Sequence, residues 1–306
     1  MSVMELAKLN ASLDTGKLPE ASVGYVKNGQ GKTLARETII KYTPSLAYAV
    51  VQELDASIAG KDILVEKNED ALQLKLITIE TVKENRRLLP IAQQFHTVPD
   101  GRFAECHLTD VLSTHSLGRY NLELKKNVTV DSFQLTDAWR DDAGFIVTDR
   151  NVFFQGVYNV AKLLPTLLVS KQSITPYAKS DFEALADFDQ TVCGFSRDAY
   201  LELLLSAKNT TILVAKSAEK SVDGYIVGNG ERVSQIYAET IEIAHALLKA
   251  YIEAKKLKQL TLFAVNGVWE CEPNEKRTVY RRHTRAVPSL IKWAKIYALN
   301  MGVHIV

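Results

Sequence analysis

The sequence has few cysteines, no excess of charge of either sign and no long apolar run. Cys106, Cys193 and Cys271 are the 3 cysteines among 306 residues, and no two of them have the CxxC spacing. An odd, sparse set disfavours both a disulfide framework and a cysteine-based zinc site. The 37 basic side chains nearly cancel the 36 acidic ones, so the chain lacks an electrostatic footprint for nucleic acid or an anionic membrane surface.

Targeting and membrane segments are also not apparent. The first 24 residues contain no apolar core behind a basic start, so we expect no secretory signal. No stretch approaches the roughly 18 consecutive apolar residues of a membrane helix. The sequence therefore predicts a cytoplasmic protein with neither nucleic acid nor membrane as a partner.

The length of the chain exceeds that of a usual single hydrophobic core, which favours two domains. Residues 168–180 contain a proline and a polar cluster between two patterned segments. Such composition is typical of a domain boundary. We therefore predict an N-terminal domain over residues 1–167 and a C-terminal domain over residues 168–306.

Hydrophobic periodicity predicts alternating helices and strands in both halves. Residues 43–59 are predicted to form a helix, because Thr43 can cap it, Pro44 occupies its first position and Gly60 follows its end. The other segments predicted in the first half are strands at 71–82, 88–98, 119–130 and 152–160, and helices at 103–117 and 131–144.

The second half repeats this pattern. We predict helices at 180–190, 196–208, 239–258 and 285–300, and strands at 210–217, 222–229, 232–238, 259–265 and 303–306. Mixed helices and strands in each half indicate an α/β (α+β) fold class with a largely open mixed sheet in each domain.

Several segments resemble the GNAT (N-acetyltransferase) superfamily. In the first half these are QQFHTVPDGRFAECHLTDVL and QLTDAWRDDAGF, and in the second half CGFSRDAYLELLL, VDGYIVGN and IYAETIEIAHALLKAYI. The resemblance covers roughly residues 40–306, and the order of the segments in both halves carries it. The chain looks most similar to tandem GNAT-like proteins, including a nematode-expanded group whose activities are largely unassigned.

This resemblance implies a cofactor and a reaction. In the superfamily the strand before the central helix splays from its neighbour, and acyl-CoA lies in the gap with its pyrophosphate at the helix N-terminus. The matching positions here are Thr97, Val98, Gly101, Arg102, Phe103 and Ala104. The implied activity is transfer of an acetyl or acyl group from acetyl-CoA, or another acyl-CoA, to a small amine or amino acid.

Such a transfer needs a base that removes a proton from the incoming ammonium group. The candidates carried by the resemblance are Glu105, His96 and Glu80, with Asp100 and Glu239 as further carboxylates. A carboxylate at a helix N-terminus can instead be a structural partner of the helix dipole.

Two departures from the superfamily pattern keep an alternative open. Residues 100–105 contain one glycine and two carboxylates, Asp100 and Glu105, where a phosphate loop is usually glycine-rich. Arg140 occupies the position at which many GNAT enzymes have a tyrosine that protonates the departing thiolate. The alternative is a non-catalytic GNAT-like module that binds a ligand or associates with itself, for example as a homodimer.

Three further features are open to a functional or a structural interpretation. The basic run from Arg281 to Arg285 is interpreted either as a phosphate contact or as a solvated charged turn. His107 and His115 lie about 80° apart around one helix, which is not the spacing of a two-histidine metal site. The three tryptophans, Trp139, Trp269 and Trp293, are expected in the cores.

Overall fold

The computed structural model describes residues 21–67, 72–77, 94–97, 104–117, 126–133, 135–219 and 221–300. The chain forms two compact units. The first unit comprises the described residues up to Asp149 together with Arg281–Val287, and the second comprises the described residues from Arg150 to Tyr280 and from Pro288 to Asn300. The predicted boundary between residues 167 and 168 falls inside the second unit, where Leu163 belongs to the core and Leu167 packs against it.

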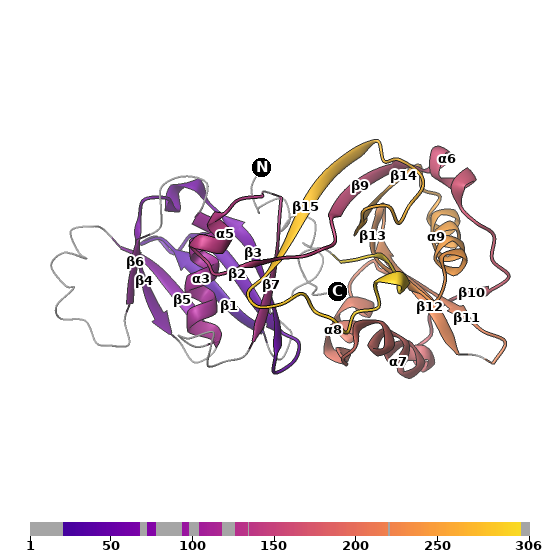
Figure 1. Ribbon diagram of the computed structural model, residues 1–306, viewed down its shortest axis with the longest axis horizontal. Helices are drawn as coiled ribbons and strands as arrows, with labels where there is room; N and C mark the ends of the chain where they lie inside the picture. The colour runs from indigo at the N-terminus through magenta and orange to yellow at the C-terminus, as the bar shows by residue number, and fades with distance from the viewer. Residues whose placement is uncertain are drawn as a thin grey trace. The chain divides into compact units, whose positions relative to one another are not determined.

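The first unit is a mixed sheet with helix α3 against it (Figure 1). Its elements are β1 Ala21–Lys27, β2 Thr33–Lys41, β3 Leu46–Leu54, a 3₁₀ turn Ala56–Ile58, β4 Asp62–Lys67, β5 Leu72–Ile77, β6 Gln94–Thr97, α3 Ala104–Leu117, β7 Asn127–Ser132, α5 Ala138–Asp141 and β8 Val147–Thr148. The strand order is β7-β3-β2-β1-β5-β4-β6, with the end of β15 beside β7. The pairs β3–β7 and β1–β5 are parallel, and the remaining pairs of this path from β7 to β6 are antiparallel.

The second unit is also a mixed sheet, with α9 packed on β11, β12 and β13 and α7 on β12 (Figure 1). Its elements are β9 Phe153–Asn159, α6 Val160–Leu163, a 3₁₀ turn Leu164–Thr166, β10 Ser173–Pro176, a 3₁₀ turn Lys179–Asp181, α7 Phe182–Cys193, α8 Asp198–Leu205, β11 Thr211–Lys216, β12 Val222–Asn229, β13 Arg232–Ala238, α9 Ile241–Lys255, β14 Gln259–Val265, β15 Glu275–His283, a 3₁₀ turn Trp293–Lys295 and β16 Ile296–Ala298. The strand order is β10-β11-β12-β13-β14-β9-β15, and β16 pairs with β13.

The mixed α/β class predicted from the sequence is confirmed, and so are most elements of the second half. Strands β12, β13 and β14 have the predicted bounds, and α7, α8 and α9 lie within or next to their predicted ranges. Helix α9 begins after Thr240, whose side chain accepts a hydrogen bond from the Ile243 amide, and it ends at Lys256 in the left-handed conformation.

The helix predicted over residues 43–59 is wrong, because Leu46–Leu54 is strand β3. Ala47, Tyr48, Ala49 and Val50 are consecutive and all buried. A strand covered on both faces has a continuous apolar run, which periodicity alone does not distinguish from a buried helix. Residues 46–54 form a strand instead of a helix because β3 pairs with β2 on one side and with β7 on the other.

Two other predicted helices are largely wrong. Within residues 131–144 the helix is limited to α5, and the segment begins with the end of β7. Residues 285–300 contain only a 3₁₀ turn followed by β16. Strands β1, β2, β4 and β15 were not predicted from the sequence.

Each unit has its own buried core. In the first unit, Cys106, Leu108, Val111 and Leu112 form the buried side of α3. Gly24 of β1 lies under this helix, since an added Cβ would come within 2.8 Å of Leu112 Cδ1. All three tryptophans were expected in the cores. Trp139 and Trp269 are buried, whereas Trp293 is half-buried.

Candidate functional site

The residues proposed for the cofactor lie around β6 and the start of α3. His96 and Thr97 are the last two residues of β6, and Ala104 and Glu105 are the first two of α3. The other candidates lie outside the described residues: Glu80, Val98, Gly101, Arg102 and Phe103. The structure therefore fixes the backbone on both sides of the predicted loop.

Strand β6, which precedes α3 in the chain, is not adjacent to β7, which follows α3. It pairs with β4, His96 opposite Ile63 and Thr97 opposite Asp62, at the end of the strand order farthest from β7. The strand parallel to β7 is β3. The opening between parallel strands in the first unit is therefore bordered by β3, and His96 and Thr97 do not lie on it.

The registered pairing of β3 with β7 ends after four residue pairs. Its register runs from Leu46 opposite Asn127 to Ala49 opposite Val130, although β3 continues to Leu54. On the opposite edge of β3 the register with β2 shifts, so that Gln52 is an extra residue between Val51 and Glu53. A bulge of this kind bends a strand and increases its twist. Beyond Ala49, β3 thus has an edge that is not registered with β7.

A buried ion pair lies where the two strands separate. Asp131 follows Val130 on β7, and Arg281 donates to both of its carboxylate oxygens at 2.8 and 2.9 Å. The Tyr48 hydroxyl donates to the same carboxylate at 2.9 Å. Burial and the Asp131 charge raise the pKa of Tyr48 well above its ordinary value. Burial alone would lower the pKa of Arg281, but the Asp131 carboxylate outweighs it and raises this pKa.

Both interpretations of the basic run 281–285 need correction. The side chains from Arg281 to Thr284 are buried, so the run is not a solvated turn, and Arg281 is paired with a carboxylate rather than turned to solvent for a phosphate. His283 is fully buried between Thr129 and Asp149, at 2.8 and 2.9 Å from its two ring nitrogens. Sequence reasoning missed this cluster because its members are separated by up to 154 residues.

Glu37 of β2 is a second feature that sequence reasoning missed. Its side chain is 5% exposed, and it hydrogen-bonds with Thr109 of α3. Burial raises its pKa to about 8, with a further contribution from the Asp110 charge and an opposing one from the Thr109 hydrogen bond. A carboxyl group with such a pKa changes its protonation near neutral pH, a property typical of functional groups but found at structural sites too. The local sequence gives no signal for this burial, because Glu37 lies in the middle of β2 between Arg36 and Thr38.

Arg140, which replaces the tyrosine of many GNAT enzymes, lies on the surface. Its guanidinium contacts Asp141 at 2.7 Å and Asp137 at 3.3 Å, and about half of the side chain is exposed. These two carboxylates raise its pKa further, so it cannot supply a proton at neutral pH.

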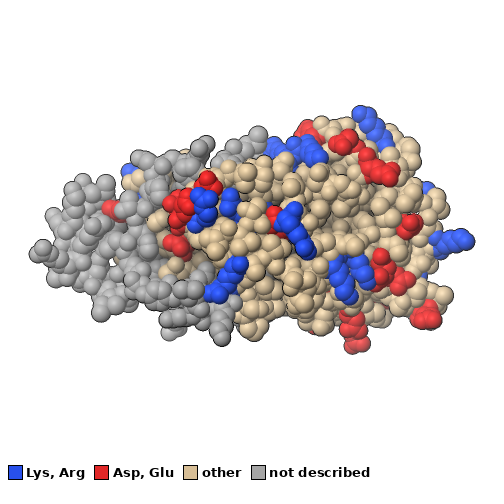
Figure 2. Space-filling model, viewed as in Figure 1, with Lys and Arg blue, Asp and Glu red and all other residues tan. Residues whose placement is uncertain are grey.

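Charges of both signs are interspersed on the face shown in Figure 2.

The second unit contains a similar arrangement of parallel strands around a helix, and its opening is filled. Strands β13 and β14 flank α9 in the chain and share one registered pair, Arg232 opposite Thr261. Strand β16 pairs antiparallel with β13 through Ile236–Ala298 and Tyr237–Ile296. On the other side, the Leu299 amide donates to the Phe263 carbonyl of β14 at 2.8 Å. The chain's own segment therefore bridges β13 and β14.

The helix end beside this segment is also satisfied internally. Thr240 caps α9, and Glu239 forms an ion pair with Lys295, just before β16. Glu242, in the first turn, has a lowered pKa because it hydrogen-bonds with Thr240 and with its own backbone amide. The positive end of the helix thus already has two carboxylates near it.

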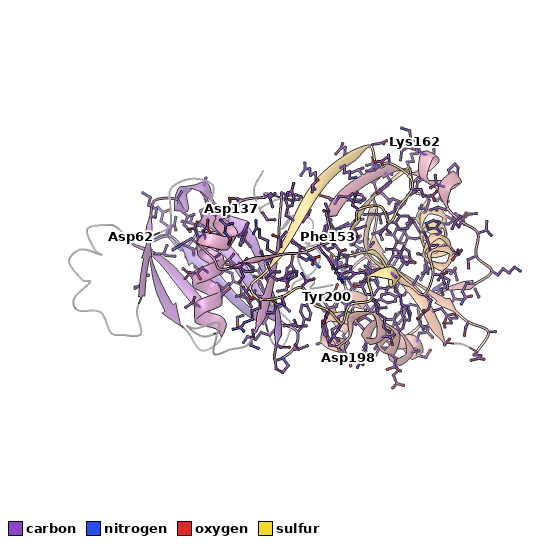
Figure 3. The ribbon with its side chains drawn as sticks, viewed as in Figure 1. Asp62, Asp137, Phe153, Lys162, Asp198 and Tyr200 are labelled. Atoms are coloured by element: carbon purple, nitrogen blue, oxygen red, sulfur yellow. The ribbon has the colours of Figure 1, made fainter. Side chains whose placement is uncertain are left out.

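A fully buried polar network lies beneath α7 and α8. Arg197 donates to Asp189 at 2.6 Å, and Tyr225 donates to the same carboxylate. Tyr200, labelled in Figure 3, donates to Gln235 at 3.2 Å. Two cation–π contacts join Arg197 to Tyr200 and Tyr237. Because every charge here has an internal partner, the network is suited to fixing the packing of the unit.

Three general properties complete the description. Among the described residues, no helix is both long and apolar enough to span a bilayer. The same residues contain no group of three or more His, Cys, Asp or Glu side chains arranged to hold a metal ion. The cysteines Cys106, Cys193 and Cys271 are free thiols.

Comparison with known proteins gives one family match and several distant structural matches. A family model described as "Domain of unknown function (DUF7596)" matches residues 5–147. No curated protein matches the chain. A Pyrococcus horikoshii protein, provisionally assigned as an acetyltransferase, is similar with 11% identity and a TM-score of 0.49, over 88% of this chain and 75% of that one.

Two further structures are similar over most of the chain. A tandem GNAT protein from the clavulanic acid biosynthesis pathway has 11% identity and a TM-score of 0.45, over 93% of this chain and 88% of that one. A GCN5-related N-acetyltransferase from Kribbella flavida has 11% identity and a TM-score of 0.44, over 82% of this chain and 57% of that one. The solved structures that the chain resembles thus include a tandem GNAT protein and a GCN5-related N-acetyltransferase.

Proposed function

We propose that the protein is an acyl-CoA-dependent N-acyltransferase that uses one cofactor per chain, bound to the first unit, and a small amine or amino acid as acceptor. The observation that carries the proposal is the β3–β7 pair, whose parallel register ends at Ala49 and Val130 while β3 continues. An unregistered strand edge offers backbone N–H and C=O groups to an amide-containing ligand.

The second unit supports the assignment by contrast. Its corresponding gap contains β16, hydrogen-bonded on both sides, and Ile296 and Ala298 are fully buried. A ligand would have to displace a core strand to enter. We therefore assign the second unit a structural role.

The proposed chemistry is direct transfer. The acceptor nitrogen attacks the thioester carbonyl carbon, a C–N bond forms, the C–S bond breaks, and the CoA thiolate leaves and takes up a proton. Positioning of the two substrates and backbone N–H donors for the thioester oxygen supply most of the catalysis. A base removes the proton of the acceptor ammonium, and Glu105 and Glu80 are its proposed candidates. His96 is not among them, because β6 lies at the far end of the strand order from β3 and β7.

The pyrophosphate is proposed to bind at the start of α3, a helix of 14 residues, through the amides from Thr97 to Ala104 and the Arg102 guanidinium. Glu105 would oppose this binding, so we expect a modest affinity. Only α3 and β6 of this arrangement are described, and the loop residues remain proposals.

The first experiment is a thermal-shift titration of the full chain with acetyl-CoA, free CoA and a longer acyl-CoA. A specific site raises the free energy of unfolding by about 2.7 kcal/mol at a hundredfold excess of ligand over its dissociation constant. Release of free CoA thiol with a panel of small amines then tests catalysis. No shift with any of the three ligands would contradict the proposal.

The second experiment locates the pyrophosphate. Arg102→Glu should weaken binding of acetyl-CoA by at least tenfold, whereas Arg150→Glu, the same charge change at an exposed position of the second unit, should leave it unchanged. Equal affinities of both variants would mean that the pyrophosphate lies elsewhere.

A non-catalytic module is the second candidate, favoured by a specific observation. The described end of the β3–β7 opening is occupied by the buried Asp131–Arg281 pair, and Arg140 is tied to surface carboxylates. Binding of acetyl-CoA without thiol release for any acceptor would support this candidate over the enzyme.

A further inference from the structure

A short segment from the C-terminal half of the sequence completes the first unit. The chain leaves this unit at Arg150 and returns to it at Arg281. Residues Arg281–Val287 belong to the first unit, although the sequence on both sides of them belongs to the second. Arg282 and His283 pair antiparallel with Thr148 and Val147 of β8. Arg281–His283 thus add the end of a strand to the first unit from a distant part of the sequence, and Thr284–Val287 continue beyond it without regular secondary structure.

The segment is held by its side chains as well as its backbone. Arg281, 1% exposed, forms two charge-assisted hydrogen bonds with Asp131. His283, 0% exposed, lies between the Thr129 hydroxyl and the Asp149 carboxylate. Arg281 and His283 therefore each meet a specific partner in the receiving unit, as a recognition site requires.

Asn127 and Val128 form hydrogen bonds with the backbone of the same segment. The side-chain oxygen Oδ1 of Asn127 accepts from the backbone amides of Arg285 and Ala286, at 3.0 and 3.2 Å, and its side-chain nitrogen Nδ2 donates to the Ala286 carbonyl. Val128 exchanges bonds with Thr284, its amide donating to the Thr284 hydroxyl and its carbonyl accepting from the Thr284 amide. These contacts fix the register of an extended peptide.

We propose that β7 and β8 with Asp149 form a strand-accepting surface that recognises residues 281–287 by sequence, through Asp131, Thr129 and Asn127, and that the first unit is stable only with this segment bound. The fitting partner is an extended segment of the pattern Arg-x-His-Thr. The match to the family model ends at residue 147, so the matched region does not contain the strand that completes it.

The test uses amide hydrogen exchange on the full chain with matched substitutions in one segment. Arg281→Met removes a buried contact, and Arg285→Met, at an exposed side chain of the same segment, is the control. Losing one partner of a buried ion pair should raise the opening equilibrium of the first unit by roughly a hundredfold or more. We expect this acceleration in β3 and β7, unchanged exchange in α9, and no change in either unit for the control.

A double variant separates recognition from simple loss of packing. Asp131→Leu alone should accelerate exchange as Arg281→Met does, whereas the combination should restore much of the protection, because an apolar pair replaces the ion pair. Acceleration confined to residues 281–287, equal acceleration in both units, or a double variant with the summed effects of the two single variants would each overturn the proposal.

Discussion

Each unit contains a buried arginine–aspartate pair, and the two pairs are built over very different distances in the sequence. In the second unit Arg197 and Asp189 are 8 residues apart and join consecutive helices. In the first unit Arg281 and Asp131 are 150 residues apart. The side chains of both pairs are at most 1% exposed.

The difference concerns what each pair stabilises. The local pair fixes how α7 and α8 meet β12 and β13 through Tyr225 and Gln235. The distant pair attaches Arg281–His283 of β15 to the first unit, and Arg150–Tyr280 of the second unit lie between these residues and Asp131 in the sequence. We therefore expect the second unit to tolerate changes in the first better than the reverse. The predictions below test this contrast, from the largest effect to the smallest.

The largest loss of stability is expected for Asp189→Ala, which leaves the buried Arg197 guanidinium without its carboxylate. Breaking a buried pair costs about 3–5 kcal/mol of unfolding free energy, here in the second unit. Urea denaturation followed by fluorescence measures it in a background with Trp139 and Trp293 replaced by Phe, because the remaining tryptophan, Trp269, is in the second-unit core. Asp181→Ala, which removes the partly exposed pair with Lys216, is the control and should cost about 1 kcal/mol or less. Similar losses for both variants would show that burial does not set the value of these pairs.

Glu37→Gln should change how the stability of the first unit depends on pH. The folded-state pKa of about 8 exceeds the ordinary value of 4.5, so the folded protein favours the protonated carboxyl. The stability contributed by Glu37 is fully present below pH 4.5 and is lost as pH rises through 8. At pH 9 the variant should be more stable than the native protein by on the order of 5 kcal/mol, and at pH 4 nearly equal. Denaturation curves at both pH values test this, and a pH-independent difference would contradict it.

Replacing a glycine by alanine should cost more stability in the second unit than in the first. A Cβ added at Gly224 of β12 would lie 2.8 Å from the Tyr237 carbonyl oxygen, a backbone atom, whereas one at Gly24 of β1 would meet the end of the Leu112 side chain. Because backbone cannot yield as a side chain does, Gly224→Ala should cost about 2–3 kcal/mol and Gly24→Ala about 1 kcal/mol. Thermal unfolding of both variants measures this, and the opposite order would contradict the packing described for β12.

The smallest effect is expected at the cap of α9. Thr240→Ala removes the acceptor of the Ile243 amide and should cost about 1 kcal/mol. Thr240→Ser keeps the hydroxyl and should cost less. Chemical denaturation distinguishes the two variants, and equal losses would assign the effect to the methyl group instead of the cap.

The same contrast explains which elements could be predicted from the sequence. Strands β12, β13 and β14 and helix α9 were predicted because their patterns and the Thr240 cap are local. Strand β3 was predicted as a helix because its apolar run has no period of its own and depends on neighbours as distant as β7. Segment 285–300 has helical spacing, but β16 forms because the gap between β13 and β14 offers it hydrogen bonds on both sides.

The candidate site was predictable only in part for the same reason. The start of α3 at Ala104 follows from the local pattern. The identity of the strand beside β7 does not, because β4, β5 and β6 intervene in the chain between β3 and α3. Glu37, Asp131 and Arg281 carry no local signal that would mark them as buried and ionisable.

We propose one cofactor position, in the first unit, and no position in the second unit, where β16 bridges β13 and β14. Amide hydrogen exchange of the full chain with and without saturating acetyl-CoA tests this most directly. We predict slower exchange in β3 between Val50 and Leu54 and at the start of α3, with no change in β13 or β16. Protection of β13 together with faster exchange in β16 would mean that the ligand displaces the closing strand, and it would contradict the account.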